Sequence, residues 1–356
     1  MSGEVCFLLL GETLLVPHLF PIVEAFAAKA PDVEVDVWVA NAALEGLVRP
    51  WIVDMPSVRL KRAPGFRRDA RPPAKLATLV RLLPHLARAP VVVCAEQTSL
   101  WVPRLLPWLP TRFVKTSHGV GSMSARDDPR RMAAYRTLVP SEQERGTYLA
   151  RGMPPDRIVA TGYVKAAFRH RTAARSLFAD DRQIVLYAPH WQPHRSSWPA
   201  WGRTVVELLA DQFEWNVILA PHQRLVERDP DVREVLARVS DLPHVHCDLY
   251  SFSMVDGSYT GVADVYLGDT SSQVMEFLMK PRPAVFLDPD ARSWHDDPSY
   301  AMWRAGEVVT DAAEIMSALS RASELHPDYR PAQIELAARA LGDVTGAGAD
   351  RAADEV

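Results

Sequence analysis

The sequence predicts an α/β protein built from two doubly wound, Rossmann-like domains that face a central cleft. Three observations predict this fold class. At 356 residues the chain is longer than one ordinary hydrophobic core. Short apolar runs alternate with segments of helical spacing, which is the pattern of a parallel sheet covered by helices. The alternation restarts near residue 183, so we expect two successive units of ~150 residues each.

The N-terminal domain is predicted to span residues 1–165. Its first apolar run, residues 5–10, indicates a buried strand, and a helix is expected over residues 17–29 after the loop at Gly11. Further apolar runs extend the predicted sheet, at residues 33–40, 91–95, 113–116, 138–139 and 158–160.

The C-terminal domain is predicted to span residues 183–341. Its strand candidates, separated by helical segments, are residues 184–188, 215–219, 244–247, 265–267, 284–287 and 308–309. The stretch 164–182, which contains several basic residues, is the candidate linker. The tail, residues 342–356, begins with small and polar residues, so we expect it to be flexible.

Composition narrows the class of protein. Hydrophobic residues make up 48% and charged residues 24% of the chain, as in soluble globular proteins. A net charge of -4 gives no support for a general nucleic-acid binder. The three cysteines are far apart and form neither a metal spacing nor a disulfide framework. With no signal-peptide pattern and no apolar stretch of membrane-spanning length, we expect a cytoplasmic protein, or one on the inner face of the cell membrane.

One region departs from the average charge. Residues 59–88 hold many basic side chains and a single acid, Asp69. Leucines and a valine recur there at helical spacing beside the basic residues, at Leu76, Leu79, Val80, Leu83 and Leu86. A basic amphipathic helix of this kind can lie on an anionic membrane surface or meet an anionic acceptor. It can equally be an ordinary helix with a solvated basic face, and both interpretations stay open.

The turn Gly268-Asp269-Thr270-Ser271-Ser272 stands between an apolar run and a segment of helical spacing. A strand that ends at a helix N-terminus presents unpaired backbone N–H groups and the positive end of the helix dipole, where a phosphate binds well. The hydroxyls of Thr270, Ser271 and Ser272 add donors. The simpler interpretation is an ordinary N-cap. Asp269 is expected to shape the turn, since its charge would oppose a phosphate.

Three other loops that follow predicted strands hold polar residues suited to the same ligand. They contain His118 and Gly119, then Pro189, His190 and Trp191, then His222 and Arg224. If the strand ends meet at a shared cleft, His118 can act as general base on an alcohol. His222 and Arg224 would then face a diphosphate, with His222 either neutralising it or protonating the leaving phosphate. A structural role is the competing account for a single histidine such as His118.

No metal or other cofactor is expected. His190 and His194 are four residues apart, but Pro189 and Pro193 oppose the helix that would place them on one face. No cysteine or carboxylate cluster completes a metal site. Walker-type glycine-rich loops and the Gly-x-Ser-x-Gly elbow are also absent from the sequence.

Five short motifs follow one another between about residues 113 and 310. They are His118-Gly119, Gly162-Tyr163-Val164, Ala188-Pro189-His190-Trp191, Pro221-His222-Gln223 and Asp269-Thr270-Ser271-Ser272. In this order they resemble the motifs of the CDP-glycerol glycerophosphotransferase family, enzymes of teichoic-acid and capsule synthesis with the GT-B fold. Four positions depart from the family pattern, namely Val164, His190, Gln223 and Thr270, and all lie on the donor side.

The resemblance implies transfer of glycerol phosphate, or another alditol phosphate, from a CDP-activated donor to a hydroxyl acceptor in a cell-envelope glycan or lipid. It implies an N-terminal acceptor domain with His118 as base or orienter, and a C-terminal donor domain. There His222 and Ser271 meet the donor phosphates, and Asp269 and Glu276 lie among the cleft residues. The family is also bound to the inner face of the membrane through a basic surface. Because the chain is short, a single addition is favoured over polymerisation.

Two alternatives remain from the residues. The first is a nucleotide-sugar glycosyltransferase or an enzyme like the UDP-N-acetylglucosamine 2-epimerases, which need carboxylates to move protons at a sugar carbon. Glu12, Glu96 and Glu142 are the candidates in the first domain. The second alternative is a relative that binds a nucleotide or an anionic polymer without catalysis.

Overall fold

The computed structural model describes residues 4–117, 120 and 128–356. His118 and Gly119, the predicted base and its neighbour, lie outside the described residues. The chain divides into two compact units: Met1–His170 together with Arg339–Val356, and Arg171–Ala338. The predicted linker is therefore shared between the two units, since residues 164–170 belong to the first and 171–182 to the second.

The first unit is a doubly wound parallel sheet in the order β3-β2-β1-β4-β5-β6-β7. Its strands are β1 (Glu4–Leu9), β2 (Glu34–Asn41), β3 (Val58–Arg67), β4 (Val91–Cys94), β5 (Arg112–Thr116), β6 (Arg136–Val139) and β7 (Ile158–Ala160). Its helices are α1 (Val16–Lys29), α2 (Ala42–Val48), α3 (Lys75–Leu86), α4 (Trp101–Leu105), α5 (Glu142–Ala150) and α12 (Gly348–Asp354). The order reverses between β1 and β4.

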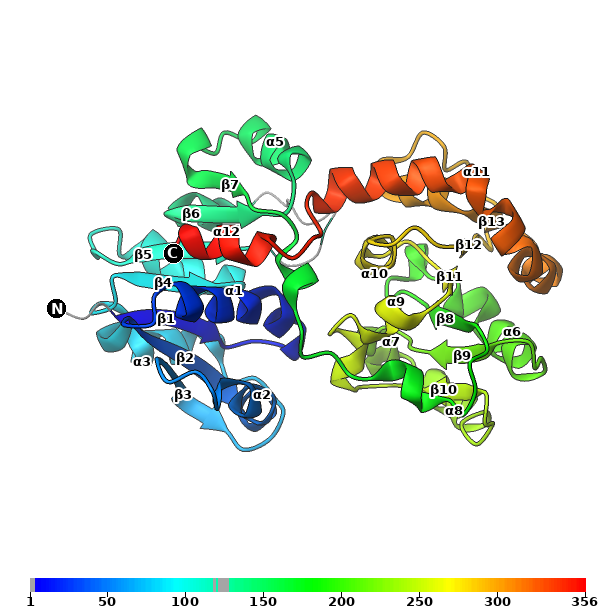
Figure 1. Ribbon diagram of the computed structural model, residues 1–356, viewed down its shortest axis with the longest axis horizontal. Coiled ribbons are helices and arrows are strands. Elements are labelled where there is room, and N and C mark those ends of the chain that lie inside the picture. Colours follow the sequence, from blue (N-terminus) through cyan, green and yellow to red (C-terminus); the bar gives the residue numbers. More distant parts are fainter. Residues whose placement is uncertain (1–3, 118–119, 121–127) are drawn as a thin grey trace. The chain divides into compact units, whose positions relative to one another are not determined.

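The second unit repeats this plan with the order β10-β9-β8-β11-β12-β13, again parallel throughout. Its strands are β8 (Ile184–Ala188), β9 (Asn216–Leu219), β10 (Val245–Cys247), β11 (Val265–Gly268), β12 (Ala284–Leu287) and β13 (Glu307–Val309). Its helices are α6 (Trp198–Ala210), α7 (Gln223–Arg228), α8 (Asp231–Ala237), α9 (Ser258–Val262), α10 (Ser272–Phe277) and α11 (Ile315–Leu341). Here the order reverses between β8 and β11, which lie side by side in Figure 1.

The predicted fold class, two Rossmann-like α/β sheets, is confirmed. The central strands were predicted well because both of their faces are covered. In β8 every residue is buried, and so is every residue of β12. A parallel strand covered on both faces must be apolar along its length, and the sequence shows that as an uninterrupted run.

Strand β3 was not among the predicted strands. It lies at the edge of the first sheet, and basic residues interrupt its apolar ones, so no apolar run marks it. The basic region therefore divides into a strand, β3, and a helix, α3, that begins only at Lys75.

The prediction of a flexible tail over residues 342–356 was wrong. Residues 348–354 form α12, which packs against α1 (Figure 1) with Ala349, Ala352 and Ala353 buried. A side chain at Gly348 would stand 3.1 Å from the backbone carbon of Gly162. The small residues that indicated flexibility are the ones that let this helix approach closely.

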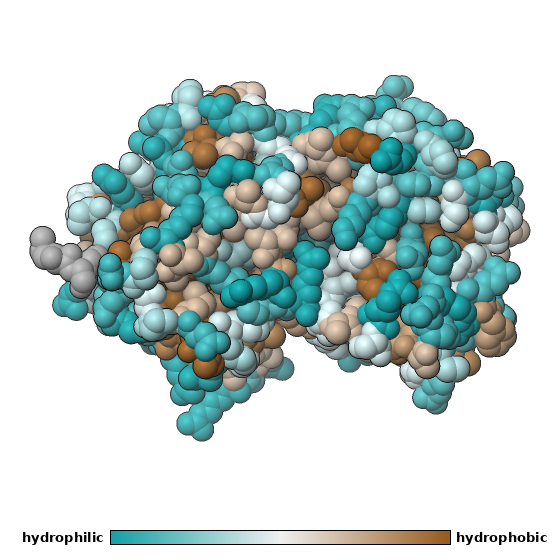
Figure 2. All heavy atoms as spheres, in the orientation of Figure 1, coloured by the Kyte–Doolittle hydropathy of each residue, from teal (hydrophilic) through white to brown (hydrophobic). Residues whose placement is uncertain are grey.

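Within the described residues, no helix is both long enough and apolar enough to span a membrane. On the face drawn in Figure 2, hydrophobic residues are interspersed with hydrophilic ones.

Candidate functional site

The candidate site lies in the second unit, where the loops after β8, β9 and β11 leave the carboxyl ends of neighbouring strands. In doubly wound sheets, ligands bind outside the carboxyl ends at the point where the strand order reverses. Here that point is the β8/β11 pair. Three of the five predicted motif segments lie in this unit, at residues 188–191, 221–223 and 269–272. The segment Gly162-Tyr163-Val164 belongs to the first unit, as does His118-Gly119, which lies outside the described residues.

Asp269 links the turn after β11 to the loop after β8. Its buried carboxylate accepts hydrogen bonds from the backbone N–H of His190 at 2.7 Å and of Ser197 at 2.9 Å. Burial raises the pKa of Asp269 to about 7, against the lowering effect of these hydrogen bonds. The carboxylate is thus committed to the protein backbone, which agrees with the expectation that it shapes the turn.

The turn itself combines a special backbone with a cap. Gly268 has φ of 148°, a conformation that favours glycine. Ser271 is the N-cap of α10, and its hydroxyl accepts from the N–H of Gln273 at 3.2 Å. Thr270 is buried, and its hydroxyl has no partner among the described residues. Ser272, the first helical residue, is exposed. The N-cap interpretation is therefore correct for Ser271. The hydroxyl of Thr270 lacks a hydrogen-bond partner among the described residues.

The loops after β8 and β9 each carry a histidine, His190 and His222, and the two ring centroids are 5.8 Å apart. Nδ1 of His190 accepts from the N–H of Gln192 at 3.2 Å. Nδ1 of His222 accepts from the N–H of Arg224 at 3.1 Å, which makes His222 the N-cap of α7. A neutral imidazole whose Nδ1 accepts must carry its proton on Nε2. Within the described part of the chain, neither Nε2 atom has a hydrogen-bond partner.

Both histidines are neutral near pH 7. Burial, together with the charges of His222 and Arg195, lowers the pKa of His190 to about 3. Burial and the charge of Arg224 lower the pKa of His222 to about 4. In this site His222 is therefore a hydrogen-bond donor through Nε2–H.

The positive charge of the site comes instead from arginines. The guanidinium groups of Arg224 and Arg228 lie over the ring of Trp191, at 5.3 and 4.4 Å from its centroid. The Trp191 ring also contacts that of His222, with centroids 6.2 Å apart. Arg228 was not among the predicted site residues, although its spacing of four from Arg224 places both on one face of a helix.

The remaining predicted residues of this unit, Pro189 and Glu276, are buried within the protein. Pro189 is buried, and its carbonyl accepts from the N–H of His222 at 3.1 Å, which ties the loop after β8 to the loop after β9. Glu276 is buried on α10. Ser197, whose N–H binds Asp269, was also missed, because nothing in the local sequence signals a contact 72 residues away.

Of the carboxylates proposed for an epimerase, Glu12 and Glu96 lie near each other in the first unit, since the charge of Glu12 acts on Glu96, whereas Glu142 lies on α5. Glu96 follows β4, where burial raises its pKa and Lys75 lies 3.1 Å away. Glu12 is exposed after β1. Glu142 pairs with Arg145 on the exposed side of α5 at 3.2 Å. Glu96 alone is a buried carboxyl at the point where the order of the first sheet reverses.

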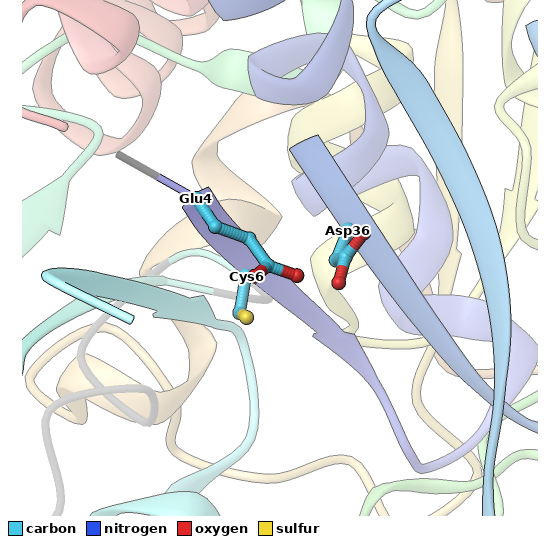
Figure 3. Close-up of side chains that lie close together, drawn as sticks. All are labelled: Glu4, Cys6 and Asp36. Atoms are coloured by element: carbon cyan, nitrogen blue, oxygen red, sulfur yellow. The ribbon is translucent and has the colours of Figure 1, made fainter. Parts of the chain in front are cut away.

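A group with metal-ligand chemistry occurs near the amino ends of two interior strands of that sheet, β1 and β2. Figure 3 shows Glu4 and Cys6 of β1 beside Asp36 of β2, and their ligand atoms lie within 4.8 Å of one another. Lys61 binds both carboxylates, and Arg59 reaches Asp36 at 2.9 Å. Burial raises the pKa of the Cys6 thiol to about 12, whereas a metal needs the thiolate. The cluster therefore belongs to an ion-pair network around the buried Asp36, with cations supplied by β3.

The basic region is thus only partly available to a partner. Arg59 and Lys61 are used by this network, and Arg62 pairs with Glu45 at 3.0 Å. Helix α3, in contrast, exposes two apolar side chains. Leu76 and Val80, one helical turn apart, are 56% and 65% exposed. The exposed arginines around them have no ion-pair partner among the described residues; they are Arg68, Arg71, Arg81 and Arg88.

Comparison with known proteins identifies the fold. No family model and no curated protein matches this chain. Among solved structures, the wall teichoic acid polymerase TagF soaked with CDPG is 14% identical over 100% of this chain and 88% of its own, with a TM-score of 0.65. MnaA of S. aureus with UDP is 13% identical over 97% and 94%, with a TM-score of 0.65. The UDP-GlcNAc 2-epimerase of Neisseria meningitidis bound to UDP-GlcNAc is 12% identical over 99% and 97%, with a TM-score of 0.62.

These similarities establish a GT-B-like fold, shared equally with epimerases and with TagF. They do not separate the two classes of enzyme, so the reaction has to be argued from the site.

Proposed function

We propose that the chain is a transferase that moves an alditol phosphate, most simply glycerol phosphate, from a CDP-activated donor to a hydroxyl acceptor. The observation that carries the proposal is the pair of neutral histidines at the β8/β11 reversal. His190 and His222 each have Nδ1 occupied by a backbone amide and Nε2–H free to donate. The turn bonded to the His190 loop carries the unpartnered hydroxyl of Thr270, and the His222 loop leads into the stacked arginines. Such a set of donors suits a diphosphate.

The proposed reaction is a phosphoryl transfer. The acceptor hydroxyl attacks the β-phosphorus of the donor, a new O–P bond forms, and the bond from that phosphorus to the bridging oxygen breaks. The hydroxyl proton passes to His118, the predicted base, and CMP leaves with the bridging oxygen. Catalysis of this type rests on positioning and on stabilising phosphate charge, which is the part assigned to His222, Arg224, Thr270, Ser271 and Ser272.

Two further points support the transferase over the epimerase. The five-motif resemblance is to glycerophosphotransferases, with His118, His190, His222 and Ser271 at the motif positions. Among the three proposed epimerase carboxylates, only Glu96 is buried at a strand reversal, whereas Glu12 and Glu142 are exposed. Proton abstraction at a sugar carbon needs more than one positioned acid or base.

The epimerase-like reaction remains the second candidate, favoured by Glu96 and by the equal structural likeness to UDP-GlcNAc 2-epimerases. A non-catalytic nucleotide-binding relative is the third. The proposal also includes attachment of the protein to an anionic membrane surface through α3, because this helix exposes Leu76 and Val80 among unpaired arginines.

The test is nucleotide release from a panel of donors by the full chain. CDP-glycerol, CDP-ribitol and UDP-N-acetylglucosamine are supplied with candidate hydroxyl acceptors, and CMP, UDP and epimerised sugar are measured. The transferase predicts CMP release that His118→Ala abolishes and that Arg233→Gln, a change on α8 away from the site, leaves intact. Epimerised sugar without nucleotide release would establish the second candidate instead. Nucleotide binding without turnover of any donor would establish the third.

A further inference from the structure

The two arginines on Trp191 form an unusual group. Arg224 and Arg228 are four residues apart on α7 and both place their guanidinium groups over one half-buried indole ring, at 5.3 and 4.4 Å. Guanidinium groups stack favourably on aromatic faces. Two like charges at this helical spacing, however, repel each other. Trp191 therefore holds together two cations that would otherwise separate.

No acid relieves this repulsion at Arg228. Within the described residues, no carboxylate lies within ion-pair distance of its guanidinium group, and the side chain is exposed. The buried acid nearest to the loop, Asp269, directs both carboxylate oxygens to backbone amides. A bound anion would supply the missing counter-charge, and a pair of planar guanidinium groups is well suited to phosphate oxygens.

This pair is connected to the rest of the candidate site by direct contacts. The Trp191 ring lies beside the rings of His190 and His222, at 5.9 and 6.2 Å between centroids. The backbone of His190 is bound in turn to Asp269 of the phosphate turn. The arginine pair is therefore linked through Trp191 to both histidine loops, and through His190 to the turn that carries Thr270.

We infer that Arg224 and Arg228, stacked on Trp191, form a second anion subsite that takes the outer phosphate of a nucleoside diphosphate. The inference rests on the proposed function, because the ligand is the diphosphate of its donor. In that reaction the outer phosphate is the group transferred, so the product CMP loses all contact with this subsite. The subsite therefore favours the donor over the nucleotide product and assists product release.

The test compares CDP, CMP and inorganic pyrophosphate by isothermal titration with the full chain. The wild type is expected to bind CDP at least tenfold more tightly than CMP. Arg228→Gln should weaken CDP and pyrophosphate binding by about tenfold and change CMP binding less than twofold. Trp191→Leu should act in the same direction as Arg228→Gln. The matched control is Arg233→Gln, because Arg233 also stacks on an aromatic ring, Tyr250 at 5.2 Å, but outside the site.

Unfolding temperatures of all variants show whether α7 is still formed. Equal loss of CDP and CMP affinity in Arg228→Gln, or no loss at all, would overturn the subsite while leaving nucleotide binding itself in place. Pyrophosphate binding that depends on Arg228, with no binding of any nucleotide, would support the subsite and contradict the proposed function. Absence of binding by both CDP and pyrophosphate would overturn the subsite as well.

Discussion

The carboxylate of Asp269 accepts a hydrogen bond from the backbone N–H of His190 at 2.7 Å, across 79 residues of sequence. The same carboxylate binds the N–H of Ser197. Through these two bonds the turn after β11 sets the course of the loop after β8, and with it the positions of His190 and Trp191. In the proposed function, an acid that faces the backbone in this way orders the loop without directing its charge at the donor phosphates.

Asp269→Asn is expected to lower stability and donor affinity together. An asparagine can accept only one of the two backbone bonds and turns its own N–H₂ toward the other amide, which costs about 1–3 kcal/mol. Chemical denaturation measures the loss. Asp241→Asn, an exposed change in the same unit, should have no effect. Wild-type stability and CDP binding in Asp269→Asn would contradict the role given to this carboxylate.

His222→Asn should reduce the acid sensitivity of the free protein. Because the folded-state pKa of His222 is lowered to about 4, the unfolded state takes up its proton first, near pH 6.5. Stability is therefore complete above about pH 6.5 and is lost as the pH falls toward 4. Asparagine retains the N-cap acceptor without titrating. Urea unfolding between pH 4.5 and 7.5 should show a shallower decline for the variant, and parallel declines would contradict the lowered pKa.

Ala352→Asp is expected to destabilise the first unit. Ala352 is fully buried on α12, which packs against α1, so the change introduces an unpaired charge into that contact. We expect a lower midpoint for the first unit in thermal unfolding, without a change in the second. Thr345→Asp, at an exposed position of the same segment, serves as the control. If both variants unfold like the wild type, the tail does not contribute to the fold.

Lys61→Met is expected to lower the free energy of unfolding by about 3 kcal/mol, because the buried carboxylate of Asp36 then keeps Arg59 as its ion-pair partner but loses Lys61. Arg49→Met, which removes an exposed arginine from Glu45 but leaves Arg62 paired with it, should cost less than about 1 kcal/mol. Zinc should leave the stability of the wild type unchanged, since Glu4, Cys6 and Asp36 are held by cations or protonated. A rise in unfolding temperature with stoichiometric zinc would show that the cluster is a metal site after all.

Binding to anionic vesicles should depend on α3. Sedimentation with vesicles containing phosphatidylglycerol is expected to bring down the wild type at low salt and less of it at high salt. Leu76→Ser with Val80→Ser removes the two exposed apolar side chains and should reduce binding severalfold. Val53→Ser, equally exposed on the same unit, is the control. Equal binding to vesicles of phosphatidylcholine alone would contradict the anionic surface.

How well the sequence predicted each element depended on how local its signal was. Strands β8 and β12 were predicted with their observed bounds, because burial on both faces leaves a continuous apolar run. Strand β3 was missed because its charged residues find partners on β1 and β2, which no local pattern reports. Ser271 and His222 could be proposed from the sequence because they stand in loops directly after predicted strands. Arg228 and Ser197 could not, because their roles depend on contacts with Trp191 and Asp269.

The sequence by itself determined the two parallel sheets and the positions of the polar loops, because periodicity of apolar residues along a chain directly reflects burial in strands and helices. Only the tertiary structure decided which loops meet, which basic residues keep a free charge, and how His190 and His222 titrate. These properties depend on desolvation and on charges brought from distant parts of the chain. That is why the turn at residues 268–272 could be proposed as a phosphate site from one short stretch, while Arg228 could be proposed as its cation only once β8, β9 and β11 were side by side.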